Sequence, residues 1–109
     1  MIPEIAVKQM EIARLCRRFE VVRLDIFGSA ATGAFEPETS DLDFVARFAR
    51  TNDTTYPDRY LDFAEELERL FNRDVDVITE RSVRNPYFRA EIDRTRELVY
   101  AADNEEAAG

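Results

Sequence analysis

The chain has 109 residues, of which 45% are hydrophobic and 35% charged, and it carries a formal net charge of −8 with no histidine. This length corresponds to one domain with a single core, and no apolar stretch approaches the roughly 20 residues that span a membrane. The missing histidine excludes a Ser-His-Asp triad and a histidine-ligated zinc, and the single Cys16 excludes an internal disulfide.

The net charge and the N-terminal sequence limit the classes of binding partner and the cellular compartment that we expect. An acidic chain does not favour direct binding to a nucleic-acid backbone, which needs clustered lysine and arginine. Charged residues run through the segment from Met1 to Glu20, so the N-terminus lacks a signal-peptide pattern. We therefore expect a cytoplasmic protein without membrane association.

Helical and strand patterns alternate along the chain. The expected elements, in order, are a helix from Pro3 to about Phe19, a strand over 21–27, a short helix over 30–33, a loop over 35–40, a strand over 42–48, a helix from about Pro57 to Phe71, a strand over 75–79, a helix opened by Asn85 and Pro86, and a short strand over 98–101. We expect Thr55 to cap the long helix and Cys16 to be a core residue.

This order predicts an α/β (α+β) fold with a small mixed sheet flanked by helices. The strand–helix–strand unit over 42–79 should be a parallel crossover. The domain is expected to span 1–102, and the polar segment 103–109 to be a disordered tail. Tyr87 and Phe88 are expected to be core anchors, with a place beside a base pocket as the alternative. The arginines near the C-terminal end are read as ordinary surface residues; the alternative is that they steer a nucleotide or contact a partner.

Three aspartates stand at the beginnings of two predicted strands. Asp41 and Asp43 are two residues apart and therefore aim their carboxylates at one face, and Asp76 interrupts the third strand near its start. If these strands run parallel, Asp76 lies beside the other two. Like charges so close need a partner, and an oxygen-only ligand set favours a hard divalent cation over a solvated acidic surface. Asp74 shares the side of Asp76 but lies at the strand's edge.

Gly28 and Ser29 follow the first strand directly. Backbone N–H groups at such a turn can bind a phosphate oxygen, and glycine permits close approach. For this turn to meet Asp41 and Asp43, the first strand must run antiparallel to the second. A simple turn is the alternative for the Gly-Ser pair alone.

Taken together, Gly28-Ser29 with Gly33, Ser40-Asp41-Leu42-Asp43 and Val75-Asp76-Val77 resemble the minimal nucleotidyltransferases of the DNA polymerase β-like superfamily. The likeness is to the MNT-type proteins that are paired with HEPN-domain toxins, and it covers nearly the whole chain. One departure is Thr32, which stands where that family usually has an arginine; Arg47 and Arg73 are possible substitutes.

The resemblance implies an Mg²⁺-dependent enzyme, with Mn²⁺ as a possible replacement, that transfers AMP from ATP or another NTP. The acceptor would be a hydroxyl, a tyrosine of a HEPN-type toxin, and the chain would act as its antitoxin in a hetero-oligomer. By position, Asp41, Asp43 and Asp76 would be catalytic and hold the metal, whereas Gly28, Ser29 and Ser40 would bind the nucleotide. Two alternatives are a non-catalytic antitoxin that neutralises its partner by binding, which the residue Thr32 favours, and a purely structural cation site.

Overall fold

The structure, a computed structural model, describes residues 1–33, 36 and 41–102. The described elements, in chain order, are α1 (Pro3–Ala6), α2 (Gln9–Arg18), β1 (Val21–Phe27), α3 (Ser29–Thr32), β2 (Leu42–Phe48), α4 (Tyr56–Phe71), β3 (Val75–Thr79), a 3₁₀ turn (Glu80–Ser82), α5 (Pro86–Thr95) and β4 (Glu97–Ala101). Among the described helices, none combines the length and apolar character needed to cross a membrane.

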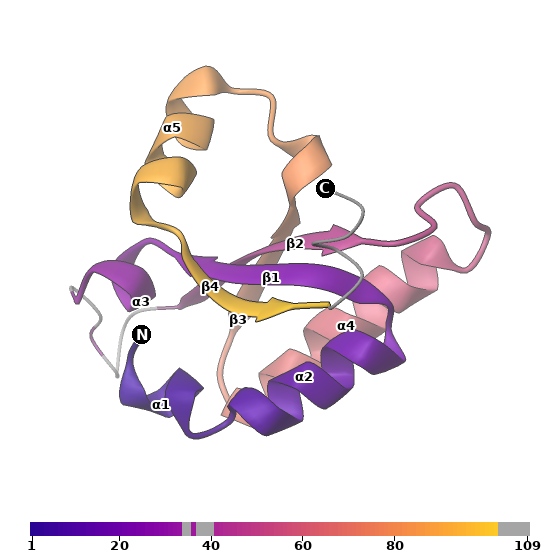
Figure 1. Ribbon diagram of the computed structural model, residues 1–109, viewed down its shortest axis with the longest axis horizontal. Coiled ribbons are helices and arrows are strands. Elements are labelled where there is room, and N and C mark those ends of the chain that lie inside the picture. The colour runs from indigo at the N-terminus through magenta and orange to yellow at the C-terminus, as the bar shows by residue number, and fades with distance from the viewer. Residues whose placement is uncertain (34–35, 37–40, 103–109) are drawn as a thin grey trace.

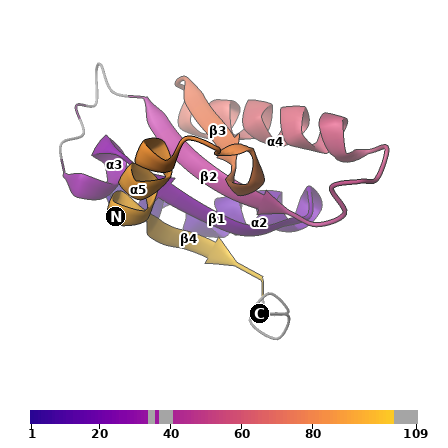
Figure 2. The same cartoon turned by 90° about the horizontal axis from the view of Figure 1, so that it is seen from above.

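The four strands form one mixed sheet in the order β3-β2-β1-β4, visible side by side in Figure 2. β1 runs antiparallel to both of its neighbours, β2 and β4, whereas β2 and β3 are parallel and are connected through α4. Both predicted pairings, β1 with β2 and β2 with β3, are therefore confirmed, as is the α/β fold class.

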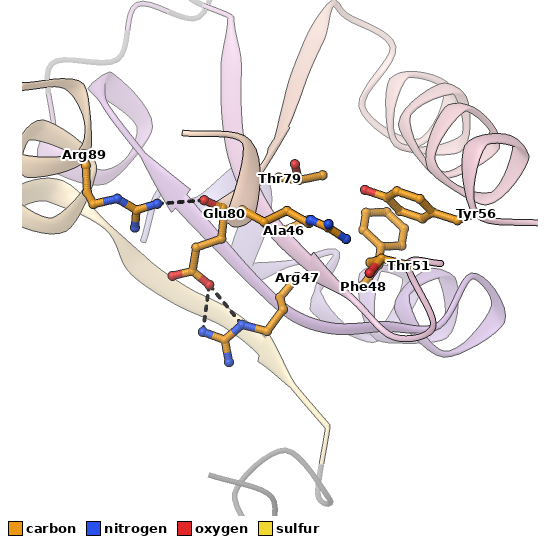
Figure 3. A pocket seen from close by; sticks show the side chains of 9 residues that line it. Ala46, Arg47, Phe48, Thr51, Tyr56, Thr79, Glu80 and Arg89 are labelled. Carbon is orange, nitrogen blue, oxygen red and sulfur yellow. Dashed lines mark hydrogen bonds and ion pairs between the residues drawn. The ribbon is translucent and has the colours of Figure 1, made fainter. Parts of the chain in front are cut away.

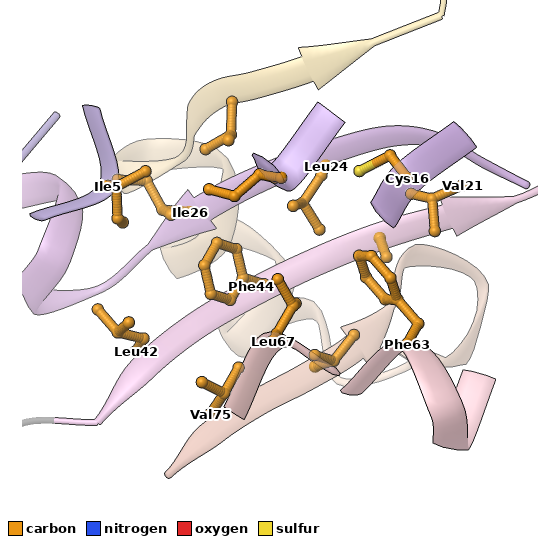
Figure 4. Close-up of a cluster of buried hydrophobic side chains, with 14 of the residues drawn as sticks. Ile5, Cys16, Val21, Leu24, Ile26, Leu42, Phe44, Phe63, Leu67 and Val75 are labelled. Carbon is orange, nitrogen blue, oxygen red and sulfur yellow. The ribbon is translucent and has the colours of Figure 1, made fainter. Parts of the chain in front are cut away.

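The main core lies between one face of the sheet and helices α2 and α4 (Figure 1). Side chains from alternate strand positions point to this face, including Leu24 and Phe44, and meet Phe63 and Leu67 of α4 (Figure 4). Cys16 belongs to the same core, and burial raises the pKa of its thiol to about 12, so it stays protonated. The prediction that Cys16 is a core residue is confirmed.

The opposite face of the sheet is covered only in part, by α5 (Figure 1). Ile92 of α5 packs there on Phe27 and Val45 in a second, smaller apolar cluster. Beside this cluster Asp25 is 1% exposed, and its carboxylate accepts hydrogen bonds from Arg23 (3.0 Å) and Arg96 (2.6 Å). α5 is thus attached to β1 by apolar packing and by a buried ion pair.

Two helix predictions differ from the structure. The first helix is interrupted: the N–H of Lys8 donates to the carbonyl of Ile5, an i→i−3 bond that tightens the turn and ends α1 before α2 begins at Gln9. Thr55 does not cap α4 through its side chain; its hydroxyl and its N–H both bond to Asp53 Oδ1 instead. The spacing of apolar residues continues across the break between α1 and α2 and across the start of α4. The sequence pattern alone therefore indicated neither the break nor the missing cap.

A third prediction is wrong for the start of α5. Tyr87 is 86% exposed and Phe88 41% exposed, so neither is a core anchor. Asn85 accepts hydrogen bonds from both of their N–H groups, and this cap fixes the first turn with Tyr87 facing solvent. Phe88 still touches the sheet, because its ring stands edge-on to Phe27 with centroids 5.9 Å apart.

The Asp25–Arg96 pair gives a stability prediction. Arg96→Ala should lower the free energy of unfolding by about 3 kcal/mol, because it leaves a buried carboxylate with only Arg23 as a partner. The matched control is Arg94→Ala, two residues earlier, which removes an exposed pair with Glu91 and should cost less than about 0.5 kcal/mol. Urea denaturation of both variants measures the difference, and equal losses would show that the buried pair does not stabilise α5.

Candidate functional site

Two of the three predicted carboxylates lie side by side at the beginnings of β2 and β3. The parallel register places Asp43 directly opposite Asp76, so the two carboxyl groups lie close enough to interact. Burial raises the pKa of Asp43 to about 6, and repulsion by Asp76 and then by Asp41 adds to the rise. The carboxyl group of Asp43 is therefore protonated under mildly acidic conditions, which reduces the negative charge at the site.

Asp41 completes the predicted set from the edge of the sheet. It is exposed and precedes β2 by one residue, and its charge is close enough to raise the pKa of Asp43. In the described parts of the chain, no three His, Cys, Asp or Glu side chains are arranged to hold a metal ion. The oxygen donors of Asp43 and Asp76, with Asp41 beside them, nevertheless suit a hard divalent cation, because their repulsion is what such a cation relieves.

The Gly28 turn lies against the same carboxylates. Phe27 pairs with Asp43, the second residue of β2, in the antiparallel register, so Gly28 follows at the edge where β2 begins. Gly28 has φ of 71° and ψ of −145°, and a Cβ there would meet Asp43 Oδ2 at 3.1 Å. Only glycine combines this backbone conformation with such close approach. The predicted meeting of the Gly-Ser turn with the strand that carries Asp43 is therefore seen.

Ser29 begins the short helix α3, and the first N–H groups of a helix have no intrahelical partner. The N–H of Gly28 itself is used within the fold, since it donates to the hydroxyl of Thr95 at 3.1 Å. Ser40, the other predicted nucleotide-binding residue, lies outside the described residues. In α3 the N–H groups of Ala31 and Thr32 donate to the carbonyl of Gly28, at 3.0 and 3.1 Å. The amides that can face an incoming anion are therefore those of Ser29 and Ala30 at the start of the helix, and not that of Gly28.

Thr95 is a site residue that the sequence did not indicate. It ends α5, is buried, and its hydroxyl accepts from Gly28 while donating to the carbonyl of Glu91 at 2.9 Å. Ile92 and Phe88 stand on the same side of α5 as Thr95, one and two turns earlier, and both contact Phe27 or its cluster. α5 thus holds the end of β1 and the Gly28 turn together.

The two arginines considered as substitutes for the family's arginine take part in ion pairs. Arg47 lies four residues after Asp43 on β2 and donates to Glu80 Oε2 at 2.7 Å. Arg73 pairs with Glu4 of α1 at 3.3 Å. Thr32, which stands at the arginine position, is exposed at the end of α3.

Comparison with known proteins points to one family. The model of the nucleotidyltransferase domain matches residues 10–99. A candidate protein adenylyltransferase from Methanocaldococcus jannaschii is 33% identical over 99 residues, which cover 91% of this chain and 93% of that protein. A second candidate protein adenylyltransferase of the same organism is 35% identical over 69 residues, covering 63% of this chain and 76% of the relative.

Solved structures share the fold. A candidate minimal nucleotidyltransferase superposes with a TM-score of 0.70 at 28% identity, covering 84% of this chain and 89% of that chain. A chain from the complex of a tri-AMPylated Shewanella oneidensis HEPN toxin with MNT antitoxin gives a TM-score of 0.63 at 18% identity, covering 95% of this chain and 78% of that one. The predicted resemblance to minimal nucleotidyltransferases is confirmed.

The Gly28 turn can be tested by the smallest possible change. Gly28→Ala should lower the free energy of unfolding by roughly 2–3 kcal/mol, because the methyl group meets Asp43 and the backbone must leave its conformation. Gly33→Ala is the control, since φ is 86° there but no atom lies within 4 Å, and it should cost only about 1 kcal/mol. Urea denaturation in EDTA measures both. A smaller cost at Gly28 than at Gly33 would contradict the close approach.

The raised pKa of Asp43 predicts how stability depends on pH. A carboxyl whose folded pKa lies above its unfolded value stabilises the fold below the unfolded pKa, and this contribution is lost as the pH rises through about 6. Asp43→Asn removes the titration. In EDTA, the free energy of unfolding of the variant, relative to that of wild type, should therefore rise by on the order of 1 kcal/mol from pH 4 to pH 7. The expected change is small because solvent screens charges at this partly open site. A pH-independent difference would exclude this assignment.

Proposed function

This chain belongs to the nucleotidyltransferase domain family and is an enzyme of that class, and we propose that it transfers AMP from ATP to a hydroxyl group of a partner protein. The observation that carries the proposal is the Asp43–Asp76 pair facing the Gly28 turn across the edge of the sheet. The relatives named for protein adenylyltransferase activity support AMP as the group transferred. An acidic chain with an ATP donor suits a cytoplasmic protein acceptor.

Each residue of the site has a role in this proposal. Asp41, Asp43 and Asp76 would hold Mg²⁺, or Mn²⁺ in its place, and the cation supplies charge neutralisation for the triphosphate when bound. Ser29, with Ser40, binds the terminal phosphates, and Gly28 lets them approach the backbone. Asp76, which is exposed beside Asp43, accepts the proton of the attacking hydroxyl. The hydroxyl oxygen bonds to the α-phosphorus, the bond to the β-phosphate breaks, and pyrophosphate leaves.

The acceptor we propose is a tyrosine of a HEPN-domain toxin, with this chain as its antitoxin in a hetero-oligomer. The support is the fold shared with MNT antitoxins, including a chain from a complex in which the HEPN toxin is tri-AMPylated. The same fold occurs in a toxin–antitoxin structure determined with AMP-PNP.

A second candidate is an antitoxin that neutralises its partner by binding alone. Thr32 favours it, because a threonine cannot offset phosphate charge where the family has an arginine. The two candidates differ in their dependence on the carboxylates.

The test is transfer of label from α-labelled ATP, with Mg²⁺, to the product of the gene that neighbours the gene for this chain. We expect wild type to label it, and the double variant Asp41→Ala with Asp43→Ala to lose more than about a hundredfold of the rate. Co-expression with the toxin provides the second readout. Protection by the double variant equal to that by wild type would favour neutralisation by binding, and no labelling by wild type of a folded partner would refute transfer.

Thr95 should influence catalysis without touching substrate. Thr95→Val keeps the shape but removes the acceptor for the Gly28 N–H, so the turn should loosen and the KM for ATP should rise about tenfold. Thr95→Ser keeps the hydroxyl and should restore the KM. Steady-state kinetics of the two variants, beside their melting temperatures, check this. If Thr95→Ser and Thr95→Val shared one KM, the hydroxyl would have no positioning role.

A further inference from the structure

A cavity of about 390 Å³ opens at the far ends of β2 and β3, away from the carboxylates. The pairing of the two strands stops at Ala46 opposite Thr79, and β2 continues to Phe48 without a neighbour on that side in the described chain. The chain then turns away through the 3₁₀ segment that begins at Glu80, and this turn leaves the cavity between the strand ends (Figure 3).

The walls of the cavity carry more positive than negative charge. Three arginines line it, Arg47, Arg81 and Arg89, against one acid, Glu80. In a chain with a net charge of −8, this is a local reversal of sign. The carboxylate of Glu80 is moreover shared with Arg96, whose Nη1 donates to Oε1 at 2.9 Å.

Two of these arginines are held in place by the fold. Arg89 uses one terminal nitrogen to donate to the carbonyls of Glu80 (2.8 Å) and Val83 (3.1 Å), and Arg47 donates twice to Glu80. Figure 3 shows both side chains directed at Glu80. Arg81 is exposed at the same rim. A guanidinium that is already positioned loses little entropy when an anion binds to it.

The remaining walls include two aromatic rings. Phe48 and Tyr56 both line the cavity and meet edge to face, with centroids 5.4 Å apart. Thr51 and Thr79 add hydroxyl groups to the lining. The volume lies within the range of pockets that take small ligands.

From these features we propose that the cavity binds a phosphate ester carried on an aromatic or heteroaromatic body, with a nucleoside monophosphate as the simplest member of that class. The phosphate lies against Arg81 and Arg89, where two guanidinium groups can donate to it, and the ring lies against Tyr56. Arg47 lies four residues beyond Asp43 along β2, about 13 Å at strand spacing, so this site is separate from the carboxylate site. It needs no metal.

The experiment is a titration of the full chain with AMP in EDTA, followed by two-dimensional amide NMR. Adenosine and inorganic phosphate are titrated separately, to distinguish the contributions of the ring and the anion. The variant is Arg81→Glu, which reverses one exposed charge at the rim. The matched control is Arg84→Glu, an exposed arginine three residues later that does not line the cavity.

We expect AMP to saturate with shifts centred on Thr51, Thr79 and Arg81, and to bind at least about tenfold more tightly than adenosine or phosphate alone. Arg81→Glu should weaken AMP about tenfold and Arg84→Glu should leave it unchanged. The proposal is overturned if AMP does not saturate, if its shifts centre on Gly28 and Asp43, or if the two variants bind AMP equally. None of these outcomes depends on transfer activity.

Discussion

The register between β2 and β3 is the constraint on which the site depends. Parallel pairing with Asp43 opposite Asp76 forces two carboxyl groups together on one face, because side chains of paired residues in a sheet point the same way. A shift of β3 by one residue would turn Asp76 into the main core and would turn Val75 and Val77 out of it. The apolar residues that fill the core thus also fix the position of the charges that repel.

The Gly28 turn lies against Asp43 and Asp76 only because a second layer of structure packs on that face of the sheet. The main core between the sheet and helices α2 and α4 places nothing on the face where Asp43 lies, and α5 supplies the missing support. Thr95 bonds to the N–H of Gly28, and the next residue, Arg96, bonds to the buried Asp25 two residues before Phe27. Burial would lower the pKa of Arg96, but its hydrogen bonds to Asp25 and Glu80 outweigh this and raise it, so Arg96 stays charged.

The local sequence pattern was sufficient to predict where the strands lie and where the carboxylates stand on them. The predicted bounds of β1, β2 and β3 agree with the structure because each strand is a largely apolar segment with a glycine or a charged residue within two positions after its end. The placement of Asp43 beside Asp76 followed from the expected parallel pairing of β2 and β3. No local sequence pattern indicated the contacts that α5 makes with β1 and the Gly28 turn. Thr95 is 67 residues from Gly28, and Arg96 is 71 from Asp25, so nothing in the neighbourhood of either residue indicated its partner. The exposure of Tyr87 also escaped prediction, because an aromatic residue after a proline fits a core helix equally well.

The two ends of β2 and β3 carry opposite charge, and this bears on how the protein treats anions. At the beginnings of the strands, the carboxyl groups of Asp43 and Asp76 repel a triphosphate, and Asp41 adds to the repulsion. In the proposed reaction a cation would therefore be a physical requirement for nucleotide binding there and not only a chemical aid, the more so with Thr32 in place of an arginine. At the other end Arg81 and Arg89 attract an anion without a cation. The supply of divalent metal would then decide at which end of the sheet a phosphate compound is bound.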